Sequence, residues 1–242
     1  MGRIIAISSG DLQSTAPINE YAVKMIKGNA KNLLFISTAS HDAEGYIESM
    51  TQVFGKLGCQ VRALKLTTGS YTPEEIKEMV SWADIIYVGG GDTIFMMNTW
   101  KQYGLNKLLK EVYEKDTAVL MGISAGAICW FDCGCTDSEL AVIRDGLKYG
   151  WANDMLKLHN YAFCPHYEDR VEDFALLLQE KQIDAIALES DTAFVEENGK
   201  VYYIKCSEKA KVFEFRYANG SFEKQEIEAE NIFAVCGEDR MK

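Results

Sequence analysis

Short apolar runs alternate with longer amphipathic stretches through the first half of the sequence, and this alternation constrains the fold more than any other feature. The runs are rich in β-branched residues, which is typical of parallel strands that are buried on both faces. The amphipathic stretches have the length of helices that connect such strands. We therefore predict an α/β fold, a three-layer α/β/α sandwich with a mostly parallel central sheet.

The expected elements follow this alternation as far as residue 131. Pro73 suits the first turn of a helix, and Thr72 before it can cap that helix. The strands are expected at Arg3–Ser8, Asn32–Thr38, Gln60–Lys65, Ile85–Val88 and Thr117–Gly122, and the helices at Ala16–Lys27, Ala43–Leu57, Pro73–Trp82, Asp92–Tyr103 and Ala125–Phe131.

The pattern changes after about residue 183, where the apolar runs become short and two Asn-Gly pairs separate them. Asn-Gly is a strong signal for a two-residue hairpin turn, so we expect antiparallel strands that extend or cover one edge of the parallel sheet. No linker-like segment interrupts the chain, and we predict a single domain over residues 1–242. The strands expected here are Ala185–Leu188, Ala193–Val195, Val201–Ile204 and Val212–Tyr217.

The charge balance argues against several classes of partner. The chain has 25 Lys and Arg against 36 Asp and Glu, a net charge of −11, so we expect no nucleic-acid and no membrane partner. The apolar run at the N-terminus is too short for a secretory signal, and no apolar stretch of about 20 residues occurs, so we expect a cytoplasmic location. The seven cysteines have no paired CxxC spacing; we expect reduced thiols and no metal site, although Cys129, Cys133 and Cys135 leave a metal or redox role open.

One pentapeptide, Gly122-Ile123-Ser124-Ala125-Gly126, follows an apolar strand and precedes a helical stretch. This is the context of a G-x-S-x-G nucleophile elbow, in which side chains at the flanking glycines would collide. Ser124 would be exposed on a tight turn, and the Ala125 N–H could stabilise an oxyanion. The alternative is a small-residue turn in which Ser124 only caps the helix.

A second glycine cluster, Gly89-Gly90-Gly91-Asp92-Thr93, follows the strand Ile85–Val88. The carboxyl ends of neighbouring parallel strands face the same crevice. If this strand lies beside the Ser124 strand, Gly90 or Gly91 could supply a second oxyanion donor. A phosphate-binding loop is the competing interpretation, but the P-loop lysine and the G-x-G-x-x-G spacing are absent, and we expect no cofactor.

A serine nucleophile needs a general base, and the chain has only three histidines, His41, His159 and His166. Only His166 ends an apolar extended run, so we predict that it is the base. No histidine follows it, which disfavours the ordinary α/β-hydrolase, whose histidine comes last. Glu189 and Glu139 are both candidates for the carboxylate that orients the imidazole.

Four segments together resemble the peptidase E (aspartyl dipeptidase) family of cytosolic serine peptidases, which is related to cyanophycinase. The resemblance implies an α/β sandwich similar to class I glutamine amidotransferase domains, with Ser in place of their elbow Cys. The segments are Val88-Gly89-Gly90-Gly91-Asp92-Thr93, Gly122-Ile123-Ser124-Ala125-Gly126-Ala127, Cys164-Pro165-His166-Tyr167 and Glu189-Ser190-Asp191-Thr192-Ala193.

The roles that the resemblance implies agree with the reasoning from the residues. Ser124 is the nucleophile, His166 is the base, and the flanks of Glu189 fit the third position better than those of Glu139. The oxyanion donors are the N–H groups of Ala125 and of Gly90 or Gly91.

Aspartyl dipeptidases carry a substrate-binding Arg in a longer segment after the His, whereas here Arg170 is the only nearby cation. Arg170 is therefore a candidate substrate-binding residue, and selectivity for Asp-X dipeptides stays open.

The combined expectation is a serine-type hydrolase that acts on small peptides as a dipeptidase or exopeptidase, through an acyl-enzyme and without a metal ion. We keep two alternatives: an amidase or esterase that acts on non-peptide substrates, and a catalytically silent ligand-binding domain. The expected partner is a small peptide substrate, and a homodimer is left open.

Overall fold

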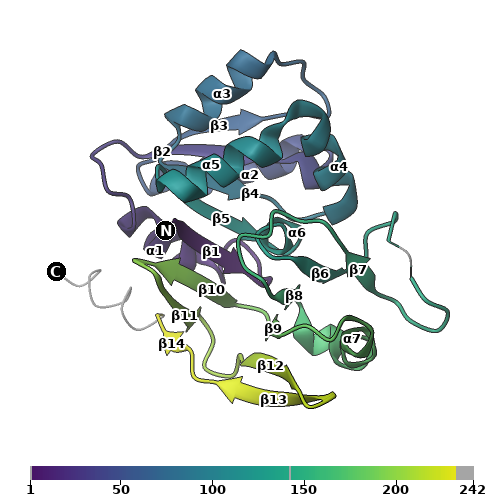
Figure 1. Ribbon diagram of the computed structural model, residues 1–242. Coiled ribbons are helices and arrows are strands. Elements are labelled where there is room, and N and C mark those ends of the chain that lie inside the picture. Colours follow the sequence, from purple (N-terminus) through teal and green to yellow (C-terminus); the bar gives the residue numbers. More distant parts are fainter. Residues whose placement is uncertain (1, 142, 233–242) are drawn as a thin grey trace.

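A computed structural model describes residues 2–141 and 143–232, and these residues form two β-sheets with helices packed around them (Figure 1). The larger sheet contains β1 (Arg3–Ile7), β2 (Asn32–Ile36), β3 (Gln60–Leu64), β4 (Ile85–Val88), β5 (Val119–Ile123), β10 (Thr192–Glu197), β11 (Lys200–Lys205) and β14 (Glu230–Asn231). Their order is β14-β11-β10-β1-β5-β4-β2-β3, and the strands from β1 to β3 are mutually parallel.

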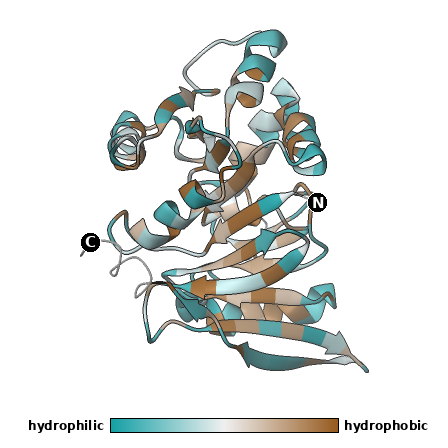
Figure 2. Cartoon of the chain, turned by 90° about the vertical axis from the view of Figure 1, so that its left-hand side faces the viewer, coloured by the Kyte–Doolittle hydropathy of each residue, from teal (hydrophilic) through white to brown (hydrophobic). Residues whose placement is uncertain are grey.

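Helices cover both faces of the parallel part of this sheet. The helices are α1 (Ala16–Lys24), α2 (Glu44–Lys56), α3 (Pro73–Trp82), α4 (Thr93–Tyr103), α5 (Leu105–Lys115) and the short α6 (Ala125–Ile128), with a 3-10 turn, η1, at Thr38–Ser40. One buried cluster joins the sheet to α1 and α2, and a second joins its other face to α3, α4 and α5. Hydrophobic residues accordingly run along the central strands (Figure 2). The predicted α/β sandwich is confirmed.

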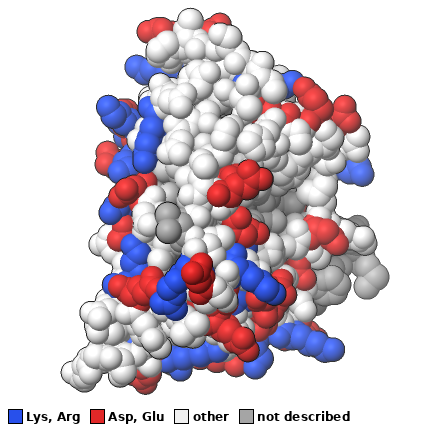
Figure 3. All heavy atoms as spheres, turned by 90° about the vertical axis from the view of Figure 1, so that its right-hand side faces the viewer, with Lys and Arg blue, Asp and Glu red and all other residues white. Residues whose placement is uncertain are grey.

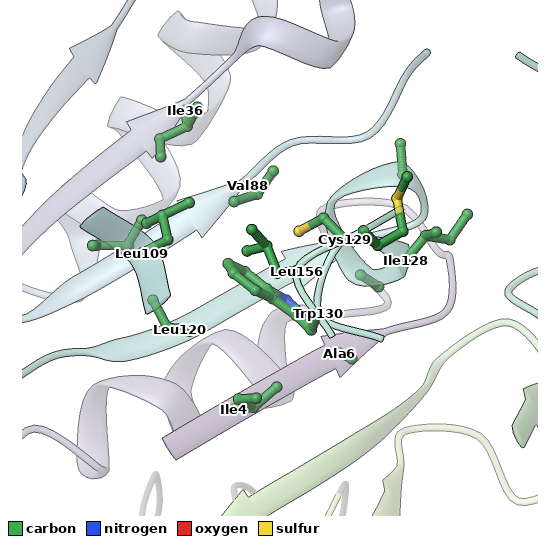
Figure 4. Packing of buried hydrophobic residues seen from close by; sticks show 14 of the residues in the cluster. Ile4, Ala6, Ile36, Val88, Leu109, Leu120, Ile128, Cys129, Trp130 and Leu156 are labelled. Atoms are coloured by element: carbon green, nitrogen blue, oxygen red, sulfur yellow. The ribbon is translucent and has the colours of Figure 1, made fainter. Parts of the chain in front are cut away.

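Figure 4 shows the packing on one of these faces. The fully buried indole of Trp130 lies near Ile4 and Leu120, which come from the adjacent strands β1 and β5. Leu156, from the segment between β7 and β8, packs in the same cluster. The chain that follows the short helix α6 therefore helps to cover the sheet.

The second sheet is a feature that the sequence did not predict. It contains β6 (Cys133–Thr136), β7 (Gly150–Ala152), β8 (Ala162–Cys164), β9 (Ala185–Leu188), β12 (Val212–Ala218) and β13 (Ser221–Ile227), in the order β13-β12-β9-β8-β6-β7. The strand β9 follows the helix α7 (Tyr167–Lys181) and pairs with β8 in parallel. α7 packs on this sheet, where Phe174 lies beside Phe215.

The C-terminal strands are therefore shared between two sheets. β10 and β11 extend the large sheet from β1, as expected, whereas β9 and β12 pair with each other in the second sheet and do not extend that edge. Both Asn-Gly hairpins are confirmed, since Asn198 and Gly199 have φ values of 53° and 74°, and Asn219 and Gly220 have values of 53° and 81°. Positive φ values at both central residues are typical of the type I′ turn, which connects two antiparallel strands in a two-residue hairpin.

Other differences are local. The sequence did not predict α5, which begins immediately after Gly104 ends α4 with a left-handed backbone. The edge strand β3 is half exposed rather than buried on both faces. The predicted single domain, 1–242, includes residues outside those described and stays a prediction. No helix in residues 2–141 and 143–232 is long and apolar enough to cross a membrane.

We expect the Thr72→Ala substitution to lower the free energy of unfolding by about 1 kcal/mol, the usual contribution of an N-cap. The Thr72 hydroxyl accepts the Glu75 N–H at 3.2 Å, and the Glu75 carboxylate accepts the Thr72 N–H at 2.7 Å. Urea unfolding measures the change. The matched control is Thr51→Ala inside α2, which we expect to be neutral or slightly stabilising because alanine has the higher helix propensity. Equal effects of the two substitutions would contradict the capping role.

Candidate active site

The backbone of Ser124 is the first feature of the site. Ser124 lies between β5 and α6 with φ 54° and ψ −115°, a conformation that costs energy for any residue with a side chain. A Cβ on Gly122 would lie 2.2 Å from the Gly126 carbonyl oxygen, and a Cβ on Gly126 would lie 2.2 Å from that of Val88. Both positions require glycine, which confirms the predicted steric reason for the G-x-S-x-G pattern.

Ser124 contacts one of the three histidines. Its Oγ lies 3.0 Å from Nε2 of His166, which follows β8 and directly precedes α7. The nucleophile candidate therefore comes from the large sheet and the base candidate from the second sheet. Both side chains are partly exposed, so a substrate can approach them.

Burial is the main cause that lowers the pKa of His166, and the nearby Arg170 guanidinium lowers it further. The carboxylates of Glu168, Asp137 and Asp169 act in the opposite direction, but more weakly. A lowered pKa keeps the imidazole neutral to a more acidic pH, and only the neutral ring can accept a proton.

The other two histidines lie away from Ser124. His159 Nε2 is 2.9 Å from a carboxylate oxygen of the buried Glu196, and the His41 ring packs at a tilt against Phe95 with a centroid distance of 4.1 Å. Neither forms a hydrogen bond with the serine. The structure therefore brings His166, and not the two alternatives, to the elbow.

The glycine cluster after β4 lies beside the elbow. β4 pairs with β5 with Val88 opposite Gly122, so the neighbouring strands that the sequence argument required are present. A Cβ on Gly90 would lie 3.4 Å from that of Ser124, which places this glycine next to the nucleophile candidate. The Gly90 N–H donates to the Tyr46 hydroxyl at 3.5 Å, which is long for a hydrogen bond, so this N–H can form a stronger bond with another acceptor.

Gly91 and Ala125 complete the predicted oxyanion donors. Gly91 has φ 138°, and a Cβ there would lie 2.1 Å from the Ala39 carbonyl oxygen, so its close packing on η1 requires glycine. Ala125 is the first residue of α6, where the N–H has no acceptor within the helix. Ala125 directly follows Ser124, and Gly91 directly follows Gly90 in the loop after β4; the oxyanion role of their N–H groups stays a prediction.

Neither predicted acid touches the imidazole. The Glu189 carboxylate accepts the Lys211 N–H at 2.9 Å, and Glu139 is exposed in the segment after β6. Glu189 nevertheless lies at the position opposite His166 in the register of β8 and β9. Cys164 pairs with Ala187, and both His166 and Glu189 lie two residues beyond this pair. The third member of the predicted triad stays a prediction.

Arg170, the predicted substrate-binding cation, is 5% exposed and engaged with the protein. Its guanidinium donates to the Cys135 carbonyl oxygen at 2.6 Å and lies over the Tyr149 ring at 4.6 Å. Asp137 Oδ1 is 3.8 Å from the same group. These contacts hold the Arg170 guanidinium against the second sheet. From there its positive charge lowers the pKa of His166.

Ser8, which directly follows β1, is a residue near the site that was not predicted from the sequence. The Ser8 hydroxyl accepts the His166 N–H at 2.9 Å and donates to the Leu188 carbonyl oxygen at 2.6 Å. The one signal in the sequence was its position at the carboxyl end of the first expected strand, where the ends of parallel strands face the crevice. The structure shows that Ser8 is fully buried there.

Glu168 was also overlooked. Its carboxylate accepts the Ser190 N–H at 2.9 Å and contacts the Ser190 hydroxyl, which lies 2.7 Å from that of Ser9. This chain of polar groups joins the start of α7 to the ends of β1 and β9. No sequence motif marks it, because its members are far apart along the chain.

The thiols that left a metal or redox role open are buried. Burial raises the pKa of Cys129, and it raises that of Cys133 to about 11, so neither is a reactive thiolate near neutral pH. The pKa of Cys135 is instead lowered, mainly by a hydrogen bond with the Cys164 thiol and also by the Arg170 guanidinium. Cys236 lies outside the described residues. In the part of the chain that the structure describes, no group of three or more His, Cys, Asp or Glu side chains could hold a metal ion.

One hollow of the surface lies away from Ser124 and His166. A cavity of about 970 Å³ is lined mainly by residues of β11 and β12 and by residues 227–231, and it includes neither Ser124 nor His166. Figure 3 shows acidic and basic side chains interspersed over one face of the molecule rather than separated by sign. This cavity is therefore separate from the contact between Ser124 and His166.

The chain is similar in sequence to several known proteins. The sequence profile of peptidase family S51 matches residues 4–204. An uncharacterized peptidase, YgaJ, of Bacillus subtilis is 35% identical over 173 residues, which are 69% of this chain and 70% of that protein. A protein named peptidase E from Shewanella denitrificans is 31% identical over 130 residues, which are 51% of each chain.

Solved structures show the same fold. A peptidase from an acI-B1 actinobacterium superposes with a TM-score of 0.71 at 20% identity, with 95% of each chain covered. A putative peptidase E protein of Listeria monocytogenes superposes with a TM-score of 0.64 at 22% identity, over 86% of this chain and 100% of that one. With the family match over most of its length, the chain belongs to peptidase family S51, a family of serine peptidases.

Proposed function

We propose that this serine peptidase hydrolyses small peptides with Ser124 as its nucleophile and His166 as its general base. The observation that carries the proposal is the 3.0 Å contact between Ser124 Oγ and His166 Nε2 at a strained elbow. The lowered pKa of His166 supports it, because the base must be neutral to accept the serine proton. The small-peptide substrate rests on the likeness to a relative that is named peptidase E.

The reaction follows from these positions. His166 accepts the hydroxyl proton while Ser124 Oγ attacks the carbonyl carbon of the peptide, and the carbonyl oxygen becomes an oxyanion. The N–H groups of Ala125 and of Gly90 or Gly91 stabilise that charge. The C–N bond breaks as His166 returns the proton to the leaving amine. Water, deprotonated by His166, then attacks the acyl carbon. The ester bond to Ser124 Oγ breaks, His166 returns the proton to Oγ, and the carboxylic acid is released.

We further propose that Glu189 is the third member of the triad. Its register position beside His166 supports this role, and catalytic hydrogen bonds are often long or absent until substrate binds. The carboxylate would leave the Lys211 N–H and accept the imidazole Nδ1–H, which stabilises the imidazolium formed during attack.

Replacing Ser124 with Ala removes the nucleophile, and we expect kcat/KM for small peptides to fall by at least about 10³-fold. Circular dichroism should show an unchanged fold, because alanine keeps the Cβ that the elbow already accommodates. The matched control is Ser49→Ala on the exposed face of α2, which should keep full activity. Full activity in the Ser124 variant would refute the proposed nucleophile.

The pH dependence tests the base. We expect kcat/KM to rise with pH and to reach half its plateau below about 6.5, the ordinary pKa of histidine, because burial disfavours the protonated ring. Activity is lost as the pH falls through the lowered pKa and the imidazole gains a proton. The control is His159→Gln, which should leave this midpoint in place. A midpoint above 7, or one that moves with His159, would exclude His166 as the titrating base.

A pair of conservative substitutions tests the acid. We expect Glu189→Gln to lower kcat by about 10²-fold or more, because the neutral amide no longer stabilises the imidazolium. Glu139→Gln, which removes an exposed charge from the other candidate, should change kcat by no more than about twofold. Steady-state kinetics on one small peptide compares them, and the reverse order would transfer the role to Glu139.

A further inference from the structure

Ser8 contacts the backbones of both proposed catalytic residues. Its hydroxyl accepts the His166 N–H at 2.9 Å, and its carbonyl oxygen accepts the Ser124 N–H at 3.1 Å. The same hydroxyl donates to the Leu188 carbonyl oxygen at 2.6 Å. The Ser8 side chain is fully buried, so water does not compete for these bonds.

We propose that Ser8 is a positioning residue that fixes His166 against Ser124 across the junction between the two sheets; this inference rests on the proposed function. β1 belongs to the large sheet and pairs with β5, with Ile7 opposite Ile123, so Ser8 lies beside Ser124 at the ends of these strands. Leu188 ends β9 of the second sheet, and His166 lies two residues beyond the end of β8 in the same sheet. The Ser8 hydroxyl therefore joins the end of one sheet to the ends of two strands of the other.

His166 needs such an anchor because of its own conformation. It has φ 51°, a left-handed backbone that is costly for a residue with a side chain and that directly precedes α7. Its N–H points back to β1 rather than into the helix. Loss of the acceptor would leave this N–H and the Leu188 carbonyl group buried without partners, and the loop would shift to relieve them. A misplacement of about 1 Å at a reacting group can cost about 10²-fold in rate.

The test compares Ser8→Ala with Ser37→Ala. Ser37 follows β2, is equally buried, and gives its hydroxyl to Asp42 Oδ1 at 3.0 Å, so its replacement removes a similar bond that touches neither reacting residue. Ser8→Cys is the second variant, because a thiol keeps a weak hydrogen-bonding group if the alanine variant does not fold. The probe is an alkyl fluorophosphonate, and the readout is the rate constant of its reaction with the folded fraction of each variant.

We expect Ser8→Ala to react about 10 to 100-fold more slowly than the unmodified chain, Ser8→Cys to lie between them, and Ser37→Ala to stay within about twofold. In a plot of the rate constant against pH, the acidic limb is the range in which the rate constant falls as His166 gains a proton. This limb should move to higher pH in Ser8→Ala, because release of the His166 loop reduces the burial that lowers the pKa of the imidazole. A general loss of stability would reduce the folded fraction without moving this limb.

Two results would overturn the inference. One is a Ser8→Ala or Ser8→Cys variant that reacts as fast as the unmodified chain with the same acidic limb. The other is equal slowing by Ser8→Ala and Ser37→Ala, which would reduce Ser8 to an ordinary packing residue. Failure of the unmodified chain to react at Ser124 would instead contradict the proposed function, so the two failures are distinguishable.

Discussion

The positive φ of Ser124, 54° with ψ −115°, is the constraint on which the rest of the site depends. A residue with a side chain adopts this conformation only when its surroundings hold it there. Here the surroundings are the Gly122 and Gly126 backbones, which approach each other and Val88 too closely for any Cβ. The same close approach sets β4 beside β5, and so brings Gly90 next to Ser124. The positions of the proposed nucleophile and of the proposed oxyanion donor Gly90 are therefore consequences of one packing arrangement.

The proposed base comes from the other sheet, and this has a physical consequence. Ser124 and His166 are not linked by a shared strand, so their 3.0 Å contact depends on how the two sheets meet. Ser8 and the Ser9–Ser190–Glu168 chain cross this junction with hydrogen bonds between side chains and backbone. Arg170 reaches from α7 to the Cys135 carbonyl group and fixes the helix that follows His166. Polar contacts at the junction thus complement a buried apolar cluster that also spans both sheets, in which Phe163 and Leu188 join Leu120.

Local sequence patterns predicted the parts of this molecule that local forces determine. The Pro73–Trp82 helix, the Ile85–Val88 strand and both Asn-Gly hairpins agree with the structure, because capping, periodicity and turn geometry act within a few residues. The second sheet was not predicted, because β6, β8 and β9 meet through pairings between distant segments that no short pattern encodes. Ser8 was overlooked for the same reason, since a serine after a strand has no distinctive neighbours in sequence. The contact of His166 with Ser124 agrees with the sequence prediction because histidines are scarce and only one ends an apolar run.

The most direct measurement of the central claim is the site of covalent reaction with an alkyl fluorophosphonate, located by peptide mapping and mass spectrometry. A serine deprotonated by a neighbouring histidine attacks the phosphorus and keeps the phosphonyl group, whereas an ordinary serine stays inert. The account predicts one adduct per chain, on the peptide that contains Ser124, and its loss when His166 is replaced with Gln. The absence of an adduct, or its appearance on another residue with Ser124 unmodified, would contradict the account.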